Sequence, residues 1–291
     1  MGEDRVDVVI VGGGPAGLSA ALLLGRSRRK VVVVDAGRQR NRPALASHAF
    51  FTRDGASPTD LLRIAREQLE PYEVAVKDDE AIGVEREPGG FAVRTRAGLV
   101  VRGEKLLLAT GVRDRVPDID GIDALFGKSV FVCPYCDAWE QRDRRLAAWT
   151  RADGAVVHGL ALTTWSADVA VFTNGDRLAP SDRERLERAR VTVFDERVDA
   201  LERDGGKLLA VRLASGACVE RDALFVHLGE EPAAPFAEQL GCALQGNERT
   251  DVPGVWVAGD LSHDTHLVAV AVAEGVKAAC AINKALREAR Q

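Results

Sequence analysis

The stretch Val6-Asp7-Val8-Val9-Ile10-Val11-Gly12-Gly13-Gly14-Pro15-Ala16-Gly17 decides the fold of this chain. Its β-branched run predicts a strand, and the apolar run that follows the glycines predicts a helix. In such a unit Gly12 permits the tight turn, Gly14 lets backbone amides approach a pyrophosphate, and Gly17 lets the helix pack on the strand. Asp35, at the end of a second apolar run, is placed to accept hydrogen bonds from an adenosine ribose. Together these features predict a dinucleotide site, and the alternative is a glycine-rich turn without a ligand.

Composition and charge narrow the classes of function. The chain has 291 residues, of which 46% are hydrophobic and 29% charged, as in a globule of one large or two medium domains. The net charge of −5 and the dispersed arginines give no support to binding of nucleic acid or anionic membrane. No apolar run reaches about 18 residues, and no basic flank with a cleavage site precedes the first strand. We therefore expect a cytoplasmic protein that binds neither nucleic acid nor membrane.

A second stretch, Cys133-Pro134-Tyr135-Cys136-Asp137, indicates redox chemistry. Two thiols separated by two residues can close a small disulfide, and if Cys136 opens a helix, the free amides there favour its thiolate. Asp137 places a carboxyl group that can give or take a proton beside a sulfur that must lose and regain one. The alternative is half of a zinc site, but the other three cysteines and the five histidines form no second pair with metal-ligand spacing. We expect no metal, and the odd number of cysteines argues against a framework of structural disulfides.

The rest of the chain predicts strands and helices in alternation. Residues 38–53 are expected to form a loop, a helix starts near residue 58, 72–101 form a small antiparallel meander, and 106–111 contain another buried strand. After the cysteines we expect strands at 145–150, 168–173, 191–194 and 223–226, helices at 155–165 and 181–189, a meander at 198–219, and a long helix from about 266 to 286.

Four motifs resemble, in order and spacing, the low-molecular-weight thioredoxin reductase family of FAD-dependent disulfide oxidoreductases. They are GGGPAG at 12–17, LLLATG at 106–111, CPYCD at 133–137, and VPGVWVAGD at 252–260 followed by AVAEGVKAACAI. The resemblance covers nearly the whole chain and implies an α/β fold of two Rossmann-like, three-layer domains. A FAD domain, 1–116 and 248–291, would be split by an inserted NADPH-type domain, 117–247, that carries the CxxC. It also implies a homodimer.

Residue by residue, the resemblance implies cofactor and catalytic roles. Cys136 would face the flavin, Cys133 would meet the substrate, and Asp137 would be the acid/base. His266 and Leu267 stand where the family usually has Arg-Gln near the flavin ring, so contacts at the ring edge would differ. The residues expected at FAD are Gly12, Gly14, Pro15, Ala16, Gly17 and Asp35 on the ADP half, Thr110 and Gly111 beside the cofactor, Asp260 at the ribityl or pyrophosphate region, and Asn41, His48, His266 and Leu267 on loops. His48 would approach either the flavin or the substrate dithiol, and for this residue a solvated loop histidine is the alternative.

The inserted domain departs from the family at its nucleotide turn. Thr150, Ala152 and Ala155 stand where a glycine pattern is needed, so side chains would hold the amides away from a pyrophosphate. Asp153 adds negative charge near the same helix start, and Arg177 is one arginine where the family has a basic set. We therefore expect that NADPH does not bind in the usual way. The alternative is that the turn lies a few residues away.

Three functions remain open at this point. Gliotoxin- and holomycin-type dithiol oxidases, which the CPYC stretch and residues 271–279 resemble, similarly lack a usable nucleotide site. This resemblance implies that a small-molecule or peptide dithiol reduces the cysteine pair, which passes the electrons to FAD and then to O₂. The second possible function is reduction of a thioredoxin-like protein, with electrons from ferredoxin, flavodoxin or an atypical NADPH site. The third is a flavin redox sensor without turnover. We rank the oxidase first.

Overall fold

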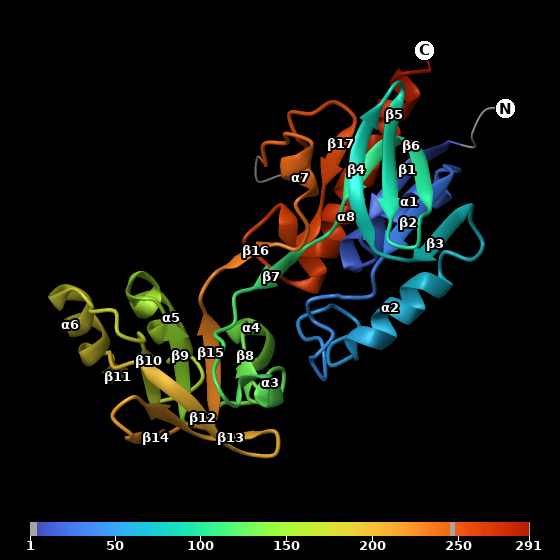
Figure 1. The fold of residues 1–291 in the computed structure, drawn as a ribbon. Helices are drawn as coiled ribbons and strands as arrows, with labels where there is room; N and C mark the ends of the chain where they lie inside the picture. The colour runs from blue at the N-terminus through green and yellow to red at the C-terminus, as the bar shows by residue number, and fades with distance from the viewer. Residues whose placement is uncertain (1–4, 245–247, 291) are drawn as a thin grey trace. The chain divides into compact units, whose positions relative to one another are not determined.

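The computed structural model describes residues 5–244 and 248–290, and the chain divides into two compact α/β units (Figure 1). Unit 1 comprises Met1–Arg42, Ala49–Arg113 and Pro232–Gln291, and unit 2 comprises Pro43–His48 and Asp114–Glu231. In each unit a largely parallel sheet lies between helices on one face and an antiparallel meander on the other. The α/β class and the two three-layer domains that the sequence predicts are therefore confirmed.

Strand β6 (Val100–Leu108) organises unit 1, because it pairs in parallel on one side and changes partner along the other. The parallel strands of this sheet are β1 (Val6–Val11), β2 (Val31–Asp35), β3 (Val74–Asp78) and β17 (Val255–Val257), and the antiparallel strands are β4 (Ala81–Glu87) and β5 (Gly90–Thr95). The expected meander over 72–101 is thus partly wrong, since β3 is parallel to β2. The expected strand at 106–111 is the continuation of the meander's last strand, because alternation predicts a strand but not its partner.

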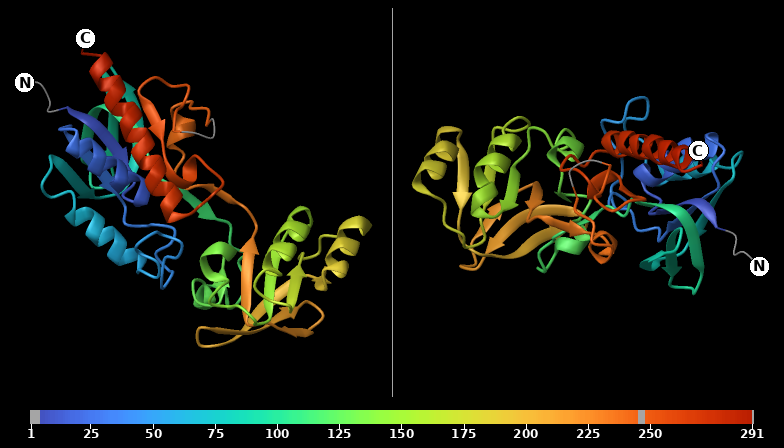
Figure 2. Two further views of the ribbon diagram at one scale, coloured as in Figure 1. Left: turned by 180° about the vertical axis from the view of Figure 1, so that it is seen from behind. Right: turned by 90° about the horizontal axis from the view of Figure 1, so that it is seen from above.

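Both faces of β1 and β2 are buried, which explains their uninterrupted β-branched runs. Val8 and Ile10 face the core formed with α1 (Pro15–Arg26) and α8 (Val268–Glu288), whereas Val9 and Val11 face the meander. Figure 2 shows the long helix α8, in red, against the blue helix α1. This packing places the end of β1, the start of α1 and the segment before α8 at one edge of the sheet. Helix α2 (Pro58–Glu67) starts where the proline predicts.

Unit 2 repeats the arrangement with a parallel sheet in the order β11-β10-β9-β15-β8. Its longer helices cover one face, and its antiparallel strands cover the other together with the short helix at Ile122–Leu125. The strands of the parallel sheet are β8 (Val130–Phe131), β9 (Leu146–Thr150), β10 (Val169–Phe172), β11 (Val191–Phe194) and β15 (Ala223–His227). The other elements are α3 (Ile122–Leu125), α4 (Pro134–Asp137), α5 (Ala155–Leu162), α6 (Pro180–Arg188), β12 (Val198–Asp204), β13 (Lys207–Leu213) and β14 (Cys218–Glu220).

The chain passes between the units at β7 (Val112–Asp114) and β16 (Glu230–Pro232), which pair with each other. The division of the chain differs from the expected 117–247 insertion in two places. The chain after β16 already belongs to unit 1, because Phe236 of α7 (Phe236–Gln239) is buried in that core. The expected boundary at 247/248 touches residues 245–247, outside the described residues. The second difference is that 43–48 belong to unit 2.

Within the part of the chain that the structure describes, no helix combines the length and the apolar character needed to cross a bilayer.

Candidate functional site

The glycine turn after β1 leaves open space where a phosphate would need it. Gly12 has a φ of +109°, and a Cβ there would overlap the carbonyl group of Ala109. A Cβ on Gly17 would overlap the Gly12 carbonyl, so both positions need glycine. A Cβ on Gly14, the N-cap of α1, would instead meet nothing within 4 Å. The free amides at the start of α1 therefore lie beside open space, as a pyrophosphate site requires.

Asp35, the expected ribose acceptor, lies at the end of β2 with its carboxyl group against Gly13 of the turn. It is buried and accepts hydrogen bonds from the Gly37 N–H at 3.1 Å and the Gln39 side-chain amide at 3.0 Å. Arg66 of α2 donates to it as well. These donors fix the carboxylate beside the open turn. Arg66 could not be identified from the sequence, because a contact across 31 residues leaves no local pattern. Gln39, four residues after Asp35, lies in the loop that the sequence predicts and was not singled out.

Thr110 and Asp260 follow the carboxyl ends of β6 and β17, at the same edge of the sheet as the glycine turn. The short helix η2 (Gly259–Leu261) lies against α1, because a Cβ on Gly259 would lie 3.0 Å from the Ala16 Cβ. Among the described residues the buried hydroxyl of Thr110 has no hydrogen-bond partner. An orphaned hydroxyl at this edge fits a bound group that supplies the missing hydrogen bond. The residues present therefore fit the ADP portion of FAD.

The other expected cofactor residues of unit 1 lie on the loops around this edge. Arg40 pairs with Asp260 at 3.3 Å, which ties the loop after β2 to η2 and brings its neighbour Asn41 into this region. Leu267 is the N-cap of α8, and the His266 Nε2 lies 2.7 Å from the His263 carbonyl oxygen. Gly111 has a φ of +68°, which favours glycine. The contacts of these residues with a flavin stay predictions.

Glu274 is a buried acid of this edge that sequence analysis did not identify as a site residue. It lies on α8, and its Oε2 accepts hydrogen bonds from the Gly259 N–H at 2.8 Å and the Ser262 hydroxyl at 2.9 Å. The His263 Nε2 lies 2.9 Å from its other carboxylate oxygen. Helix α8 thus fixes the loop that carries Asp260. The available signal was one acid inside the small, apolar run 268–276.

In unit 2, Cys133 and Cys136 form a disulfide directly after β8, with their Cα atoms 5.2 Å apart. Cys133 is the N-cap of α4, which consists of the single turn Pro134–Asp137. Cys136 therefore does not open a helix, so the condition under which free amides would favour its thiolate is not met. The proline two residues earlier starts the turn, and Cys136 lies inside it.

Asp137, the last residue of this turn, is half-buried. Burial, and then the neighbouring negative charge of Glu140, raise the pKa of Asp137 to about 6, while His48 acts to lower it. The His48 Nε2 lies 3.6 Å from the Glu140 Oε1. A carboxyl group with such a pKa can both take and give a proton near neutral pH. The structure thus places His48, which we expected at the flavin or the substrate dithiol, beside the cysteine segment.

Exposed aromatic side chains flank the disulfide turn. Tyr135, between the two cysteines, and Trp139, just after the turn, are exposed by 76% and 63%. Tyr135 makes an edge contact with Trp165 at 5.7 Å between ring centroids, and the Arg142 guanidinium lies over the Trp139 ring at 4.3 Å. This surface can pack against a substrate or partner at the redox centre.

At the turn after β9, where the family would bind a nucleotide, side chains of the protein lie against the backbone. The Ala152 N–H donates to the Asp176 carboxylate at 3.4 Å, a long hydrogen bond, so an internal anion occupies the place of an external one. Thr150 is buried, and a Cβ on Gly154 would overlap its hydroxyl. Asp153 lies in the short helix η1 (Ala152–Gly154) before α5. These residues do not fit a pyrophosphate.

Two stacked histidines lie beside this turn. The rings of His158 on α5 and His227 at the end of β15 stack at 3.6 Å between centroids, with an angle of 6° between their planes. Burial, and then the neighbouring His158, lower the pKa of His227 to about 3, and burial lowers the pKa of His158. Among the described residues the buried His227 Nε2 has no hydrogen-bond partner. Both rings are therefore neutral at pH 7.

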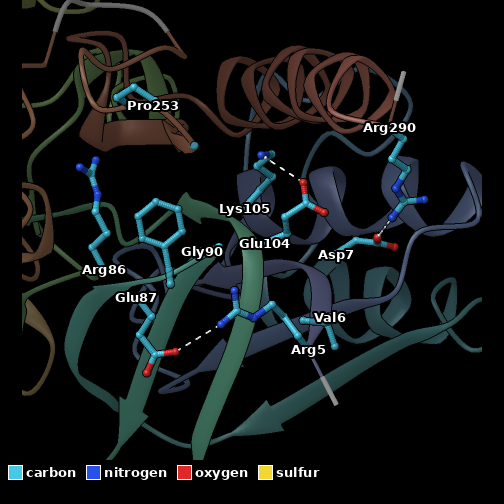
Figure 3. A pocket seen from close by; sticks show the side chains of 13 residues that line it. Arg5, Val6, Asp7, Arg86, Glu87, Gly90, Glu104, Lys105, Pro253 and Arg290 are labelled. Carbon is cyan, nitrogen blue, oxygen red and sulfur yellow. Dashed lines mark hydrogen bonds and ion pairs between the residues drawn. The ribbon is translucent and has the colours of Figure 1, made fainter. Parts of the chain in front are cut away.

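A pocket of about 720 Å³ in unit 1 lies at the opposite edge of the sheet (Figure 3). It is lined by the residues before and at the start of β1 and β17, whereas ligands of such sheets bind at the carboxyl ends of the strands. Its charged side chains pair with one another, as Arg5 does with Glu87 and Arg290 with Asp7. We therefore do not assign the cofactor to it. In the described ranges no three His, Cys, Asp or Glu side chains are grouped as a metal site would need.

Comparisons with known proteins identify the family and support the fold. Residues 6–275 match the pyridine nucleotide-disulphide oxidoreductase family. A protein of Aspergillus oryzae named thioredoxin reductase aclD is 31% identical over 97% of this chain and 96% of its own length. The crystal structure of HlmI has a TM-score of 0.92 at 35% identity, covering 99% of this chain and 94% of that chain. TrxB from Bacillus anthracis has a TM-score of 0.94 at 32% identity, covering 99% of this chain and 100% of that chain.

Proposed function

The chain belongs to the pyridine nucleotide-disulphide oxidoreductase family as a thioredoxin reductase-like, FAD-dependent enzyme, and from this premise we propose that it oxidises a substrate dithiol to a disulfide. In the proposed reaction Cys133 and Cys136 take two electrons from a small-molecule or peptide dithiol. When bound, the flavin would be the electron acceptor for the reduced cysteine pair, and O₂ would be the final acceptor. No pyridine nucleotide takes part.

The observation that carries this direction is the turn after β9. The Asp176 carboxylate accepts from the Ala152 amide, and Asp153 lies in the same turn, so an NADPH pyrophosphate would meet two negative charges. Without hydride from a nicotinamide, the supply of electrons must come from the thiol side or from a protein donor. Electrons from the substrate thiols need no protein donor, and this supports an oxidase.

The chain's own residues divide the work as follows. The turn Cys133–Cys136 presents the disulfide, and Asp137 exchanges a proton with the reacting thiols. The exposed rings of Tyr135 and Trp139 bind the apolar part of the substrate. In unit 1 the start of α1 holds the FAD pyrophosphate, and Asp35 holds the ribose.

A second candidate is a reductase of a thioredoxin-like protein that receives electrons from ferredoxin or flavodoxin. The exposed aromatic surface beside the disulfide favours it too, because Trp and Tyr are enriched at protein interfaces. Relatives named thioredoxin reductase point the same way. We further propose a homodimer in the cytoplasm, where the exposed free thiols of Cys218 and Cys280 stay reduced.

Flavin absorbance distinguishes these functions. Under anaerobic conditions, NADPH should leave the spectrum of the purified, FAD-loaded protein unchanged, whereas dithiothreitol should bleach it. In air, dithiothreitol should drive continuous O₂ uptake, which Cys136→Ser should abolish. Bleaching by NADPH would overturn the oxidase in favour of an ordinary reductase. If neither compound changes the spectrum, both enzymatic functions fail and a redox sensor remains.

A further inference from the structure

We propose that His48 and Glu140 are positioning residues for the dithiol reaction, because they lie 3.6 Å apart next to the turn that carries the disulfide and Asp137, where they can control the proton exchange of Asp137. The proposal rests on the proposed function, since it concerns the same disulfide. It adds two residues that do not themselves exchange electrons.

The segment 43–48 contacts the part of unit 2 that carries the disulfide. It is separated in sequence from the cysteines by more than 80 residues, yet it belongs to the same compact unit. At one end the Pro43 carbonyl approaches the turn before β8 so closely that a Cβ on Gly127 would lie 2.7 Å from its oxygen. At the other end His48 meets Glu140, three residues after α4 ends. One end of the segment thus contacts the chain before β8, and the other end contacts the chain after α4.

Glu140 and His48 are the electrostatic neighbours of Asp137. Glu140 raises the pKa of Asp137 by its negative charge, and His48 opposes that effect. His48 is the one titratable side chain of the segment 43–48. On the side of α4, the next charged residue after Glu140 is Arg142, whose guanidinium lies over the Trp139 ring. Because His48 and Glu140 are 3.6 Å apart, the charge on one offsets the effect of the other on Asp137.

The reaction balances with the protein's own disulfide as the oxidant. One substrate thiol loses its proton to solvent, its thiolate attacks the Cys133 Sγ, and the Cys133–Cys136 bond breaks with the electron pair leaving on Cys136. The ionised Asp137 then takes the proton of the second substrate thiol. That thiolate attacks the substrate sulfur bonded to Cys133, and the electron pair leaves on Cys133. Two electrons have moved from the substrate dithiol to the cysteine pair.

The decisive experiment compares Glu140→Gln and His48→Gln, which should shift Asp137 in opposite directions. Carboxyl ¹³C resonances of aspartate-labelled, FAD-loaded protein are followed against pH, with Asp137→Asn identifying the resonance. Glu140→Gln should lower the pKa of Asp137 by about half a pH unit, and His48→Gln should raise it by a similar amount. A structural defect would not move one group in opposite directions.

The same variants are tested in a single anaerobic turnover with dithiothreitol, in which the new cysteine thiols are trapped with iodoacetamide and counted. The acid limb of the rate should move to lower pH in Glu140→Gln and to higher pH in His48→Gln. Asp195→Asn is the control, since it removes a carboxylate of unit 2 that follows β11, at the sheet edge opposite β8. It should leave both readouts unchanged.

The outcomes separate the two proposals. If dithiothreitol is oxidised but neither the resonance nor the limb moves in the two variants, His48 and Glu140 lose their role and the oxidase stands. If the protein never oxidises a dithiol, the oxidase fails, while the resonance still decides whether the two residues control Asp137. Shifts in the same direction for both variants would overturn the inference.

Discussion

Asp137 is a half-buried acid whose ionisation should cost the folded protein stability. Its pKa is about 6 in the folded chain and near the ordinary value of 3.8 in the unfolded chain, so the folded state binds the extra proton between these values. The stability of the wild type should therefore fall, relative to Asp137→Asn, as pH rises from 4 to 6. At pH 8 we predict that Asp137→Asn is more stable by about 2 kcal/mol. Urea unfolding from pH 4 to 8 measures this, and parallel curves would refute it.

His227 should have the opposite effect on stability. Its pKa is about 3 in the folded chain and near 6.5 in the unfolded chain, so the unfolded state binds the extra proton between these values. Stability from this group is present above pH 6.5 and is lost as pH falls below it. We predict that His227→Phe, which keeps a ring against His158, gains about 2–3 kcal/mol over the wild type at pH 4.5 and little at pH 7.5. Thermal unfolding at the two pH values tests it, and an equal difference at both would contradict it.

Sequence reasoning found those site residues whose role follows from their neighbours in the chain. Gly12 and Gly17 could be predicted because strand, glycines and helix are contiguous, and the structure shows why a Cβ is excluded at both. The same reasoning missed Glu274 and Asp176, since each makes its hydrogen bonds with a distant segment. The sequence singled out the turn at Ala152, but it did not show that the Asp176 carboxylate accepts a hydrogen bond from the Ala152 N–H.

At the scale of elements, strands could be predicted better than their partners. The buried runs at β1, β2, β9 and β10 were all identified, because a strand buried on both faces is apolar throughout. The direction of β3 and the double pairing of β6 were not, because both depend on segments far away in the chain. The sequence indicated a helix at the two cysteines but not where the single turn α4 begins, since four residues carry no periodicity.

Helix α8 gives a prediction at this scale, because Glu274 links it to the loop that carries Asp260. We predict that Glu274→Ala weakens FAD binding about 5- to 150-fold, since the Gly259 N–H and the Ser262 hydroxyl lose a buried acceptor worth about 1–3 kcal/mol. Fluorescence titration of the apoprotein with FAD measures the affinity. The control is Lys277→Gln on the same helix, whose partner Glu248 is reached at the surface, and which should change the affinity less than twofold. Equal effects of both variants would remove Glu274 from this role.

At the scale of the whole molecule, a chain that returns to its first unit makes domain boundaries hard to predict. The first crossing, at β7, was expected within three residues, because a proline- and aspartate-rich stretch follows it. The second was misplaced, since Phe236 and Ala237 pack into unit 1 without any break in composition. The return of 43–48 to unit 2 could not be predicted from sequence, because it depends on contacts near Gly127 and Glu140.

The division into two units predicts where ligands should stabilise the chain. FAD at 100 times its Kd should stabilise unit 1 by about 2.7 kcal/mol, which slows hydrogen exchange about 100-fold at amides that open only with that unit. Exchange measured by mass spectrometry should therefore slow in β1, β2 and β6 and stay unchanged in β9, β10 and β15. Millimolar NADPH should leave residues 146–177 unprotected, because Asp176 already occupies the Ala152 amide. Protection of that stretch by NADPH would show a working nucleotide site, and equal protection of both units by FAD would show that they do not open independently.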